Sequence, residues 1–179
     1  MSPSDAPVLP RGGGPARPAV RRATAVVLVL SAIVGARTGL ATPVRISSSS
    51  MLPTLAAGDV VITSRAALAL DDVDHGDLVT FDSPQGGERA LKRVVGLPGD
   101  SVVIKDAVLH VNDVPVDEPY VDHELIDAYY SETYVVPEHT VFVLGDHRSN
   151  STDSRDYGPV ADEDVTGRVL VRLWPPVRR

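Results

Sequence analysis

The chain has 179 residues, no cysteine and a net charge of −7. Residues 1–43 contribute +4 (five arginines against one acid) and the remainder −11 (12 basic against 23 acidic residues). The lack of cysteine excludes disulfides, thiolate metal sites and cysteine catalysis, and the acidic remainder argues against nucleic-acid binding because it repels phosphates.

The N-terminal residues form a tail and an apolar run. Residues 1–20 are rich in Pro and Gly, which predicts a disordered cytoplasmic tail. Residues 23–36 are uncharged and mostly aliphatic, and extension to residue 44 gives the roughly 20 residues that a membrane helix needs. Arg37 lies near the far end, where its side chain can reach the interface. We therefore predict a single transmembrane helix over residues 21–44.

The orientation of this span follows from the arginines before it. By the positive-inside rule they place the N-terminus in the cytoplasm. Residues 45–179 are then expected to form an extracytoplasmic domain anchored to the cell membrane. A cleaved secretory signal peptide is an alternative interpretation of the same run, because it also combines a basic start with an apolar core. A buried core helix is a second alternative.

The domain after residue 45 has the pattern of a mostly β protein. Short runs rich in Val, Ile and Leu are separated by Gly, Pro, Asp and Asn, which is typical of strands and turns. The expected strands are DVVIT, DLVTFD, ALKRVVGL, SVVIK, VLHVN, TYVV, TVFVLGD and VTGRVLVRLW. A tight hairpin is expected at Asn112 and Asp113. We predict a sheet-rich or barrel-like domain.

An acidic insertion interrupts the strands at about residues 113–138. It holds eight acids and no Lys or Arg, which indicates a solvated, partly irregular segment. The acids lack the spacing of a calcium-binding loop, so no metal site is expected.

Four consecutive serines, residues 47–50, stand directly before Met-Leu-Pro-Thr-Leu. A serine hydroxyl becomes a nucleophile only when a neighbouring group takes its proton. The five histidines, at positions 75, 110, 123, 139 and 147, lie mostly in turn-like or acidic stretches. No Gly-x-Ser-x-Gly elbow surrounds the serines. A Ser-His-Asp triad therefore stays open but is not favoured.

Lysine is the other candidate base, because burial can lower its pKa and leave the amine neutral. The chain has two lysines, Lys92 and Lys105. Lys92 lies in the apolar run ALKRVVGLPGD, whereas Lys105 lies beside Asp106 at a strand end and is expected at the surface. Taken alone, a lysine in a strand is usually a solvated edge residue, so Lys92 needs support from other segments.

Residues 144–160, LGDHRSNSTDSRDYGPV, contain alternating Asp and Arg among small polar residues. This density indicates a loop held by charge-assisted hydrogen bonds, although an ordinary polar surface loop has a similar composition.

Together and in this order, the three segments resemble the bacterial type I signal peptidases, membrane-bound serine proteases of the Ser-Lys type. The first box is residues 48–55 (Ser-Ser-Ser-Met-Leu-Pro-Thr-Leu), the second is residues 92–100 (Lys-Arg-Val-Val-Gly-Leu-Pro-Gly-Asp), and the third is residues 145–155 (Gly-Asp-His-Arg-Ser-Asn-Ser-Thr-Asp-Ser-Arg). The resemblance covers roughly residues 20–174. Three positions depart from the family's pattern: Ser47 replaces a proline, His147 an asparagine and Ser149 an aspartate.

The resemblance implies a β-rich catalytic domain that removes signal peptides from exported preproteins, with no metal or cofactor. Ser50 would be the nucleophile, Lys92 the general base, and Ser48 a donor to the oxyanion. In the third box, Ser151 would orient the Lys92 amine, Asp153 and Arg155 would form an ion pair, and Asp146 and Arg148 would brace the loop. The walls of the substrate pocket are expected at Ile46, Val61 and Leu91. The implied partners are secretory preproteins and the lipid bilayer.

Two other functions share part of this pattern. Self-cleaving repressors also use a Ser-Lys dyad, but they need a DNA-binding module where this chain has an apolar span. A membrane-tethered β domain without catalytic activity would explain the span and the strands. It gives no reason for Ser50, Lys92 and the third box to occur together.

Overall fold

The computed structural model describes residues 24, 26–27, 41–65, 73–121 and 132–174. The chain divides into two compact units, residues 1–37 and 38–179. In the first unit the described residues Thr24, Val26 and Val27 are helical, and the rest of the predicted tail and most of the predicted span lie outside the described residues. Within the described ranges, no helix combines the length and hydrophobicity needed to cross a membrane.

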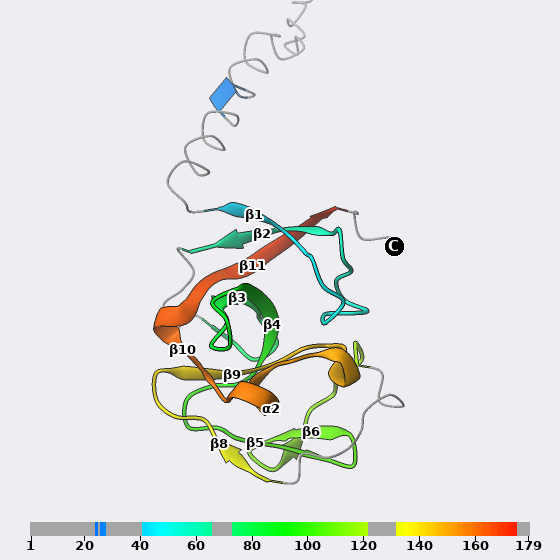
Figure 1. Ribbon diagram of the computed structural model, residues 1–179, viewed down its shortest axis with the longest axis vertical. Coiled ribbons are helices and arrows are strands. Elements are labelled where there is room, and N and C mark those ends of the chain that lie inside the picture. Colours follow the sequence, from blue (N-terminus) through cyan, green and yellow to red (C-terminus); the bar gives the residue numbers. More distant parts are fainter. Residues whose placement is uncertain (1–23, 25, 28–40, 66–72, 122–131, 175–179) are drawn as a thin grey trace, which may run out of the picture. The chain divides into compact units, whose positions relative to one another are not determined.

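The second unit is mostly β, as predicted (Figure 1). Its strands are β1 (Thr42–Arg45), β2 (Val60–Ser64), β3 (Leu78–Asp82), β4 (Arg89–Gly96), β5 (Ser101–Lys105), β6 (Val108–Val111), β7 (Val114–Pro115), β8 (Tyr134–Val135), β9 (Thr140–Leu144), β10 (Val160–Ala161) and β11 (Val165–Trp174). The short helices are η3 (Arg148–Asn150), α2 (Ser154–Tyr157) and η4 (Asp162–Asp164). Each of the eight strand runs named from the sequence contains a strand, with boundaries within two residues of the expected ones.

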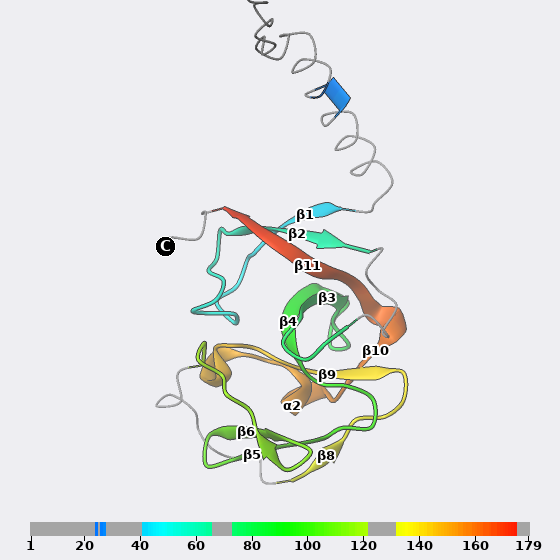
Figure 2. The same ribbon diagram turned by 180° about the vertical axis from the view of Figure 1, so that it is seen from behind.

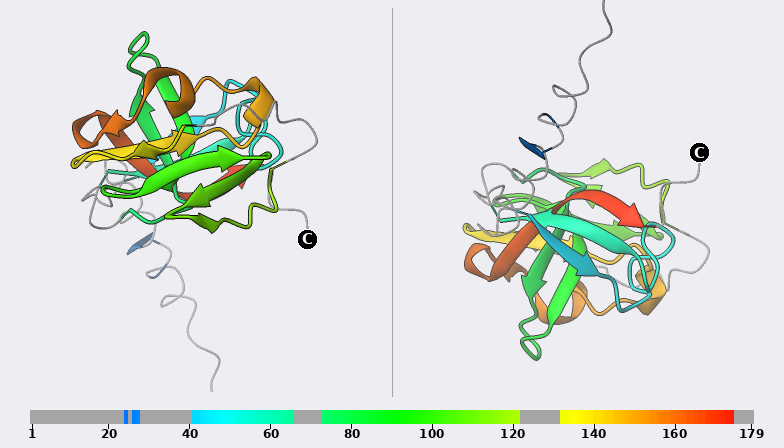
Figure 3. Two further views of the ribbon diagram at one scale, coloured as in Figure 1. Left: turned by 90° about the horizontal axis from the view of Figure 1, so that it is seen from below. Right: turned by 90° about the horizontal axis from the view of Figure 1, so that it is seen from above.

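The strands form two antiparallel sheets. The larger has the order β1-β2-β11-β3-β4-β9-β10, and the smaller has the order β7-β6-β5-β8. Figures 1 and 2 show β1, β2 and β11 at one end of the unit and β5, β6 and β8 at the other, with β3, β4 and β9 between them. Both views of Figure 3 show the loop between β3 and β4, in green, projecting from the rest of the unit.

Strand β1 corrects the boundary of the predicted membrane span. The span was expected to reach residue 44, but Thr42, Pro43 and Val44 pair with β2 in an antiparallel ladder. Strand β1 is the edge of the larger sheet, which is where a strand tolerates proline because one side of its backbone has no ladder partner. Edge pairing with β2 thus overrides the apolar continuity that favoured a longer helix.

The predicted hairpin at Asn112 and Asp113 is confirmed. Strands β6 and β7 pair across it, and both turn residues have positive φ, 53° and 64°. Two consecutive positive φ values define the type I′ turn, which matches the twist of the strands that it joins.

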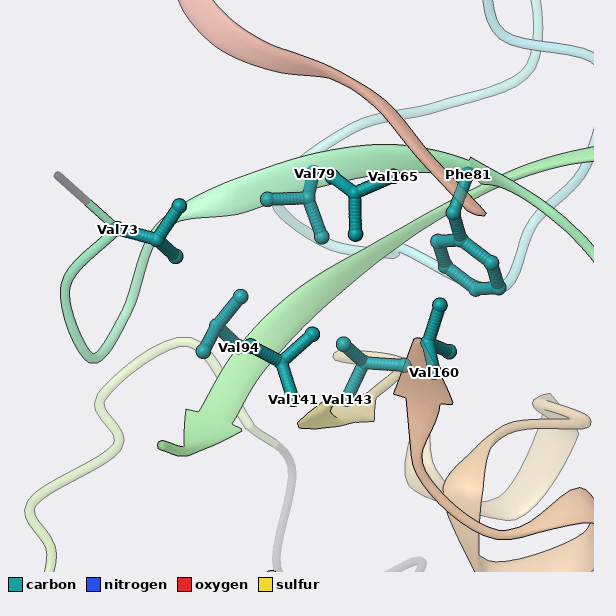
Figure 4. Packing of buried hydrophobic residues seen from close by; sticks show 8 residues of the cluster. All are labelled: Val73, Val79, Phe81, Val94, Val141, Val143, Val160 and Val165. Atoms are coloured by element: carbon teal, nitrogen blue, oxygen red, sulfur yellow. The ribbon is translucent and has the colours of Figure 1, made fainter. Parts of the chain in front are cut away.

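Three clusters of buried side chains form the core. The first lies between β3, β4, β9, β10 and β11 (Figure 4) and consists of Val73, Val79, Phe81, Val94, Val141, Val143, Val160 and Val165. The second joins β4 and β9 to the small sheet. The third consists of Ile46, Met51, Leu55 and Val61 and lies at the serine run. This third cluster fixes the position of the first box.

Candidate active site

The serine run is held at both ends by buried apolar side chains. Ile46 and Met51 are 6% and 1% exposed, whereas Ser48 between them is exposed and Ser50 is half-buried. The Ile46 amide also donates to the Asp59 carbonyl over 2.8 Å. The apolar residues on either side of the serines therefore hold a short polar segment against the core, with Ser48 left exposed. The Ser48 and Ser50 hydroxyl oxygens lie 3.2 Å apart, within hydrogen-bond distance.

Lys92 lies on β4, opposite Val79 of β3, and is 5% exposed. Desolvation by this burial lowers the pKa of its amine below the usual 10.5. The charge of Asp153 opposes the lowering, that of Arg155 adds to it, and those of Asp146 and Asp156 oppose it. The net lowering of the pKa increases the share of the neutral amine, which is the form that can accept a proton.

Ser48, Ser50 and Lys92 line one cleft of about 240 Å³. Of the predicted pocket walls, Ile46 and Leu91 also line it. Val61 does not, and this expectation was wrong. Its side chain is fully buried on β2 in the cluster with Ile46, Met51 and Leu55, so it supports the cleft from inside the core.

One edge of β4 borders this cleft without a strand partner. On one side β4 pairs with β3 from Arg89 to Arg93. On the other side its ladder with β9 begins only at Arg93, so within the described strands Ala90, Leu91 and Lys92 have no partner there. The free backbone groups of these cleft-lining residues could pair with an extended peptide.

The third box forms a loop and the helix α2 around Asp153. The Asp153 carboxylate accepts hydrogen bonds from the Gly145 amide (3.0 Å) and from Arg155 Nε (2.9 Å) and caps α2. The expected contact between Asp153 and Arg155 is thus present. Because Asp153 is fully buried, this pairing also compensates its charge.

Asp146 and Arg148 each find a partner outside the third box. Asp146 receives two hydrogen bonds from Arg93, from Nε over 2.8 Å and from Nη2 over 2.7 Å, and a third from the Thr54 hydroxyl. Arg148 forms a buried ion pair with Glu118 over 2.6 Å. Asp146 therefore ties the third box to the first and second boxes. These roles of Thr54, Arg93 and Glu118 were not predicted from the sequence.

Ser151 lies close to the serine run, and the described contacts include no hydrogen bond between Ser151 and Lys92. Its hydroxyl is buried and has no hydrogen-bond partner. A Cβ added at Gly145 would overlap this hydroxyl and come within 2.7 Å of the Ser50 carbonyl oxygen. Gly145 therefore allows Ser151 to approach the backbone of Ser50. A buried hydroxyl without a partner is uncommon, so Ser151 keeps an unused capacity for a hydrogen bond.

The histidines do not supply a base to Ser50 in the described part of the chain. His147 is the nearest in the hydrogen-bond network: its amide donates to the Ser50 carbonyl over 3.0 Å, and its Nδ1 lies 3.3 Å from the Ser49 carbonyl. Both contacts are to main-chain oxygens, so neither involves the Ser50 hydroxyl. His75 pairs with Asp100, and His123 lies outside the described residues.

A serine hydroxyl and a buried lysine thus line one cleft of a mostly β domain. The chain belongs to the signal peptidase family, peptidase S26, whose family model matches residues 19–174.

Several curated proteins are similar over most of the chain. A probable signal peptidase I-2 of Synechocystis is 38% identical over 87% of this chain and 71% of its own length. A signal peptidase I of Bacillus caldolyticus is 34% identical over 73% of this chain and 78% of its own. The thylakoidal processing peptidase 1 of Arabidopsis thaliana is 36% identical over 78% of this chain, which spans only 44% of that relative. A crystal structure of a signal peptidase I from Enterococcus faecalis, 33% identical, covers 55% of this chain and 97% of that one with a TM-score of 0.48.

Proposed function

We propose that this protein is a membrane-anchored serine endopeptidase that removes signal peptides from exported preproteins. The observation that carries the proposal is the opening of Ser50 and the buried Lys92 onto one cleft, in a chain of the signal peptidase family. Lys92 is buried, its pKa is lowered, and it forms no ion pair with any of the residues that the structure describes. It is suited to accept a proton from a nearby hydroxyl.

In the proposed reaction Ser50 Oγ attacks the carbonyl carbon of the scissile peptide bond, and the neutral Lys92 amine accepts the hydroxyl proton. The oxyanion is stabilised by the Ser48 hydroxyl, 3.2 Å from Ser50 Oγ in the structure, and by the Ser50 amide. Lys92 then protonates the leaving amine. In the second half of the reaction the neutral amine takes a proton from water, whose oxygen attacks the acyl carbon, and Lys92 gives that proton to Ser50 Oγ as the ester bond breaks. Ser151 supports this cycle as an acceptor for the lysine amine.

The proposed substrate binds as an extended strand along the free edge of β4 between Ala90 and Lys92. Alternate side chains of an extended peptide face the same wall, so residues −1 and −3 point toward the cleft floor together. Ile46 and Leu91 make parts of this wall apolar, and the small volume favours small side chains.

A preprotein with alanine at −1 should be cleaved, and its Ala→Phe variant at that position should not. The larger ring does not fit between the cleft walls, so the effect is expected on processing of the variant substrate alone. Gel-shift assays of both preproteins with detergent-solubilised protein measure this directly. Equal cleavage of the two substrates would contradict the proposed mode of binding.

Ser48→Ala should lower kcat about 10²–10³-fold, which is the usual effect of removing one oxyanion donor. KM should change little, because the hydroxyl is expected to act mainly in the transition state. Steady-state kinetics on a peptide with a small −1 residue separate the two constants. A rise in KM at unchanged kcat would instead assign Ser48 to substrate binding.

We also propose that the apolar run before β1 anchors the protein with the N-terminus in the cytoplasm and the catalytic unit outside. The preceding arginines and the uncharged residues 23–36 support this topology. Since β1 begins at Thr42, the proposed span ends before that residue.

A further inference from the structure

The first residues of the acidic insertion include a carboxylate that is not solvated. Glu118 is 1% exposed, although it lies in a segment whose composition indicates a surface position. A fully buried glutamate is rare unless it is paired. Its Oε1 accepts hydrogen bonds from Arg148 Nη2 over 2.6 Å and from the Tyr120 hydroxyl over 3.1 Å.

Glu118 and Tyr120 belong to one tight turn. The Val121 amide donates to the Glu118 carbonyl over 3.0 Å, which closes a turn with Pro119 at its second position. Proline is favoured there because its ring fixes φ at the value that the turn requires. We call residues 118–120 the 118–120 turn. Its two polar side chains are thereby held together on a rigid backbone.

The carboxylate of the 118–120 turn contacts the third box. Arg148, which pairs with Glu118, also donates from Nε to the Gly145 carbonyl over 3.0 Å. The Arg148 carbonyl in turn accepts from Arg155 Nη2 over 2.7 Å. Glu118 is therefore connected to the loop in which Gly145 lies against Ser151 and the Ser50 carbonyl.

The aromatic ring of the 118–120 turn contacts the second box. The guanidinium carbon of Arg93 lies 3.8 Å from the centre of the Tyr120 ring, which is a cation–π contact. Arg93 directly follows Lys92 on β4 and forms two hydrogen bonds with Asp146 of the third box. Tyr120 thus packs on Arg93, which links the strand that carries Lys92 to the loop that carries Ser151.

We propose that Glu118 and Tyr120 are positioning residues for the Ser-Lys dyad: the 118–120 turn holds the β4 strand and the 145–151 loop in register and so sets Lys92 relative to Ser50 and Ser151. The inference rests on the proposed function of the same site. It also gives the acidic insertion a role that the sequence pattern does not reveal.

This role differs from general stabilisation in its effect on Lys92. The charges that act on the pKa of Lys92 belong to Asp153, Arg155, Asp146 and Asp156. Two of them are linked to the 118–120 turn through one further residue. Asp146 is hydrogen-bonded to Arg93, which contacts Tyr120, and Arg155 is hydrogen-bonded to Arg148, which contacts Glu118. Desolvation is the largest influence on its pKa. Loosening the loop admits water, raises the pKa of Lys92 and moves the pH dependence of catalysis to higher pH.

The test compares variants that remove one polar contact and keep the side-chain shape. Tyr120→Phe removes the hydroxyl and keeps the ring on Arg93, and Glu118→Gln removes the charge that faces Arg148. The matched controls are Tyr134→Phe, which removes a phenol hydroxyl on β8, and Asp117→Asn, which removes an exposed charge from the neighbouring position. Burial, aided by the charge of Glu118, raises the pKa of Tyr120 to about 12, so its hydroxyl remains a donor during the assay.

Both test variants should lower kcat at neutral pH about tenfold or more, the range expected when a reacting group is displaced by a fraction of an ångström. KM should change less than about twofold, and the rising limb of kcat/KM should move to higher pH, so that activity is partly restored in alkaline buffer. The controls should match the parent protein at every pH.

Unchanged kinetics in Tyr120→Phe and Glu118→Gln would overturn the inference. The inference would also fail if kcat fell by the same factor at every pH while the rising limb of kcat/KM stayed in place. That result would indicate fewer folded molecules rather than a shifted pKa of Lys92. If Glu118→Gln does not fold, Tyr120→Phe decides alone. Failure of the proposed function has a different signature: the parent protein would not cleave a preprotein any faster than its Ser50→Ala variant.

Discussion

Lys92→Arg is expected to abolish cleavage as completely as Ser50→Ala. The guanidinium group keeps its proton near neutrality, so it cannot act as the general base that we propose for Lys92. General-base catalysis contributes about 10²–10⁴-fold, and a fixed charge beside the nucleophile adds to the loss. Initial rates of preprotein processing by the solubilised protein measure the effect, with folding of both variants checked by circular dichroism.

The second lysine supplies the matched control. Lys105 is exposed at the end of β5, so Lys105→Arg should retain the parent rate. His147→Gln should also keep substantial activity, because His147 contacts only main-chain oxygens of the serine run. Turnover by Lys92→Arg together with an inactive His147→Gln would point to a Ser-His enzyme. Activity in Ser50→Ala would remove the protease proposal and leave the tethered binding domain as the better explanation.

Gly145→Ala should have the second largest effect. The new methyl group would overlap the Ser151 hydroxyl and come within 2.7 Å of the Ser50 carbonyl oxygen, so the loop or the nucleophile segment must shift. A shift of this kind should lower kcat about 10²-fold. Overpacking of a buried site typically costs about 1–3 kcal/mol in the free energy of unfolding. Kinetics and chemical denaturation of the same preparation report the two effects.

Gly86→Ala is the control for this substitution. Gly86 has nothing within 4 Å of an added Cβ, so alanine there should alter neither rate nor stability. If Gly145→Ala behaved like Gly86→Ala, close approach at Gly145 would have no part in positioning Ser50 and Ser151.

Strands and turns near the site could be predicted from the sequence because neighbouring residues alone determine their pattern. The strand around Lys92 has the short apolar run of a buried strand, and the turn at Asn112 and Asp113 uses residues that tolerate positive φ. The three boxes are short and keep their order, so Ser50 and Lys92 could be named as candidates from the sequence before the structure placed both in one cleft.

Contacts between distant segments could not be predicted. Arg93 contacts Asp146 although 53 positions separate them in the sequence, and Arg148 contacts Glu118 although the separation is 30 positions. Glu118 is one of eight acids in its segment, and no local pattern separates it from solvated neighbours. Val61 was misplaced for a similar reason. The alternation of a strand shows that one face is buried, but not whether that face forms a cleft wall or the core beneath it.

The most direct measurement of the central proposal is the titration of the Lys92 amine itself. The chain has only two lysines, so NMR of the Lys105→Arg protein with isotopically labelled lysine should show a single side-chain signal. Because burial lowers the pKa of Lys92, the neutral fraction grows as pH rises through that lowered value, and kcat/KM should rise with it. The expected result is one titration below 10.5 whose midpoint coincides with the rising limb of kcat/KM. A lysine that titrates at 10.5 or above in a protein fully active at neutral pH would contradict Lys92 as the base.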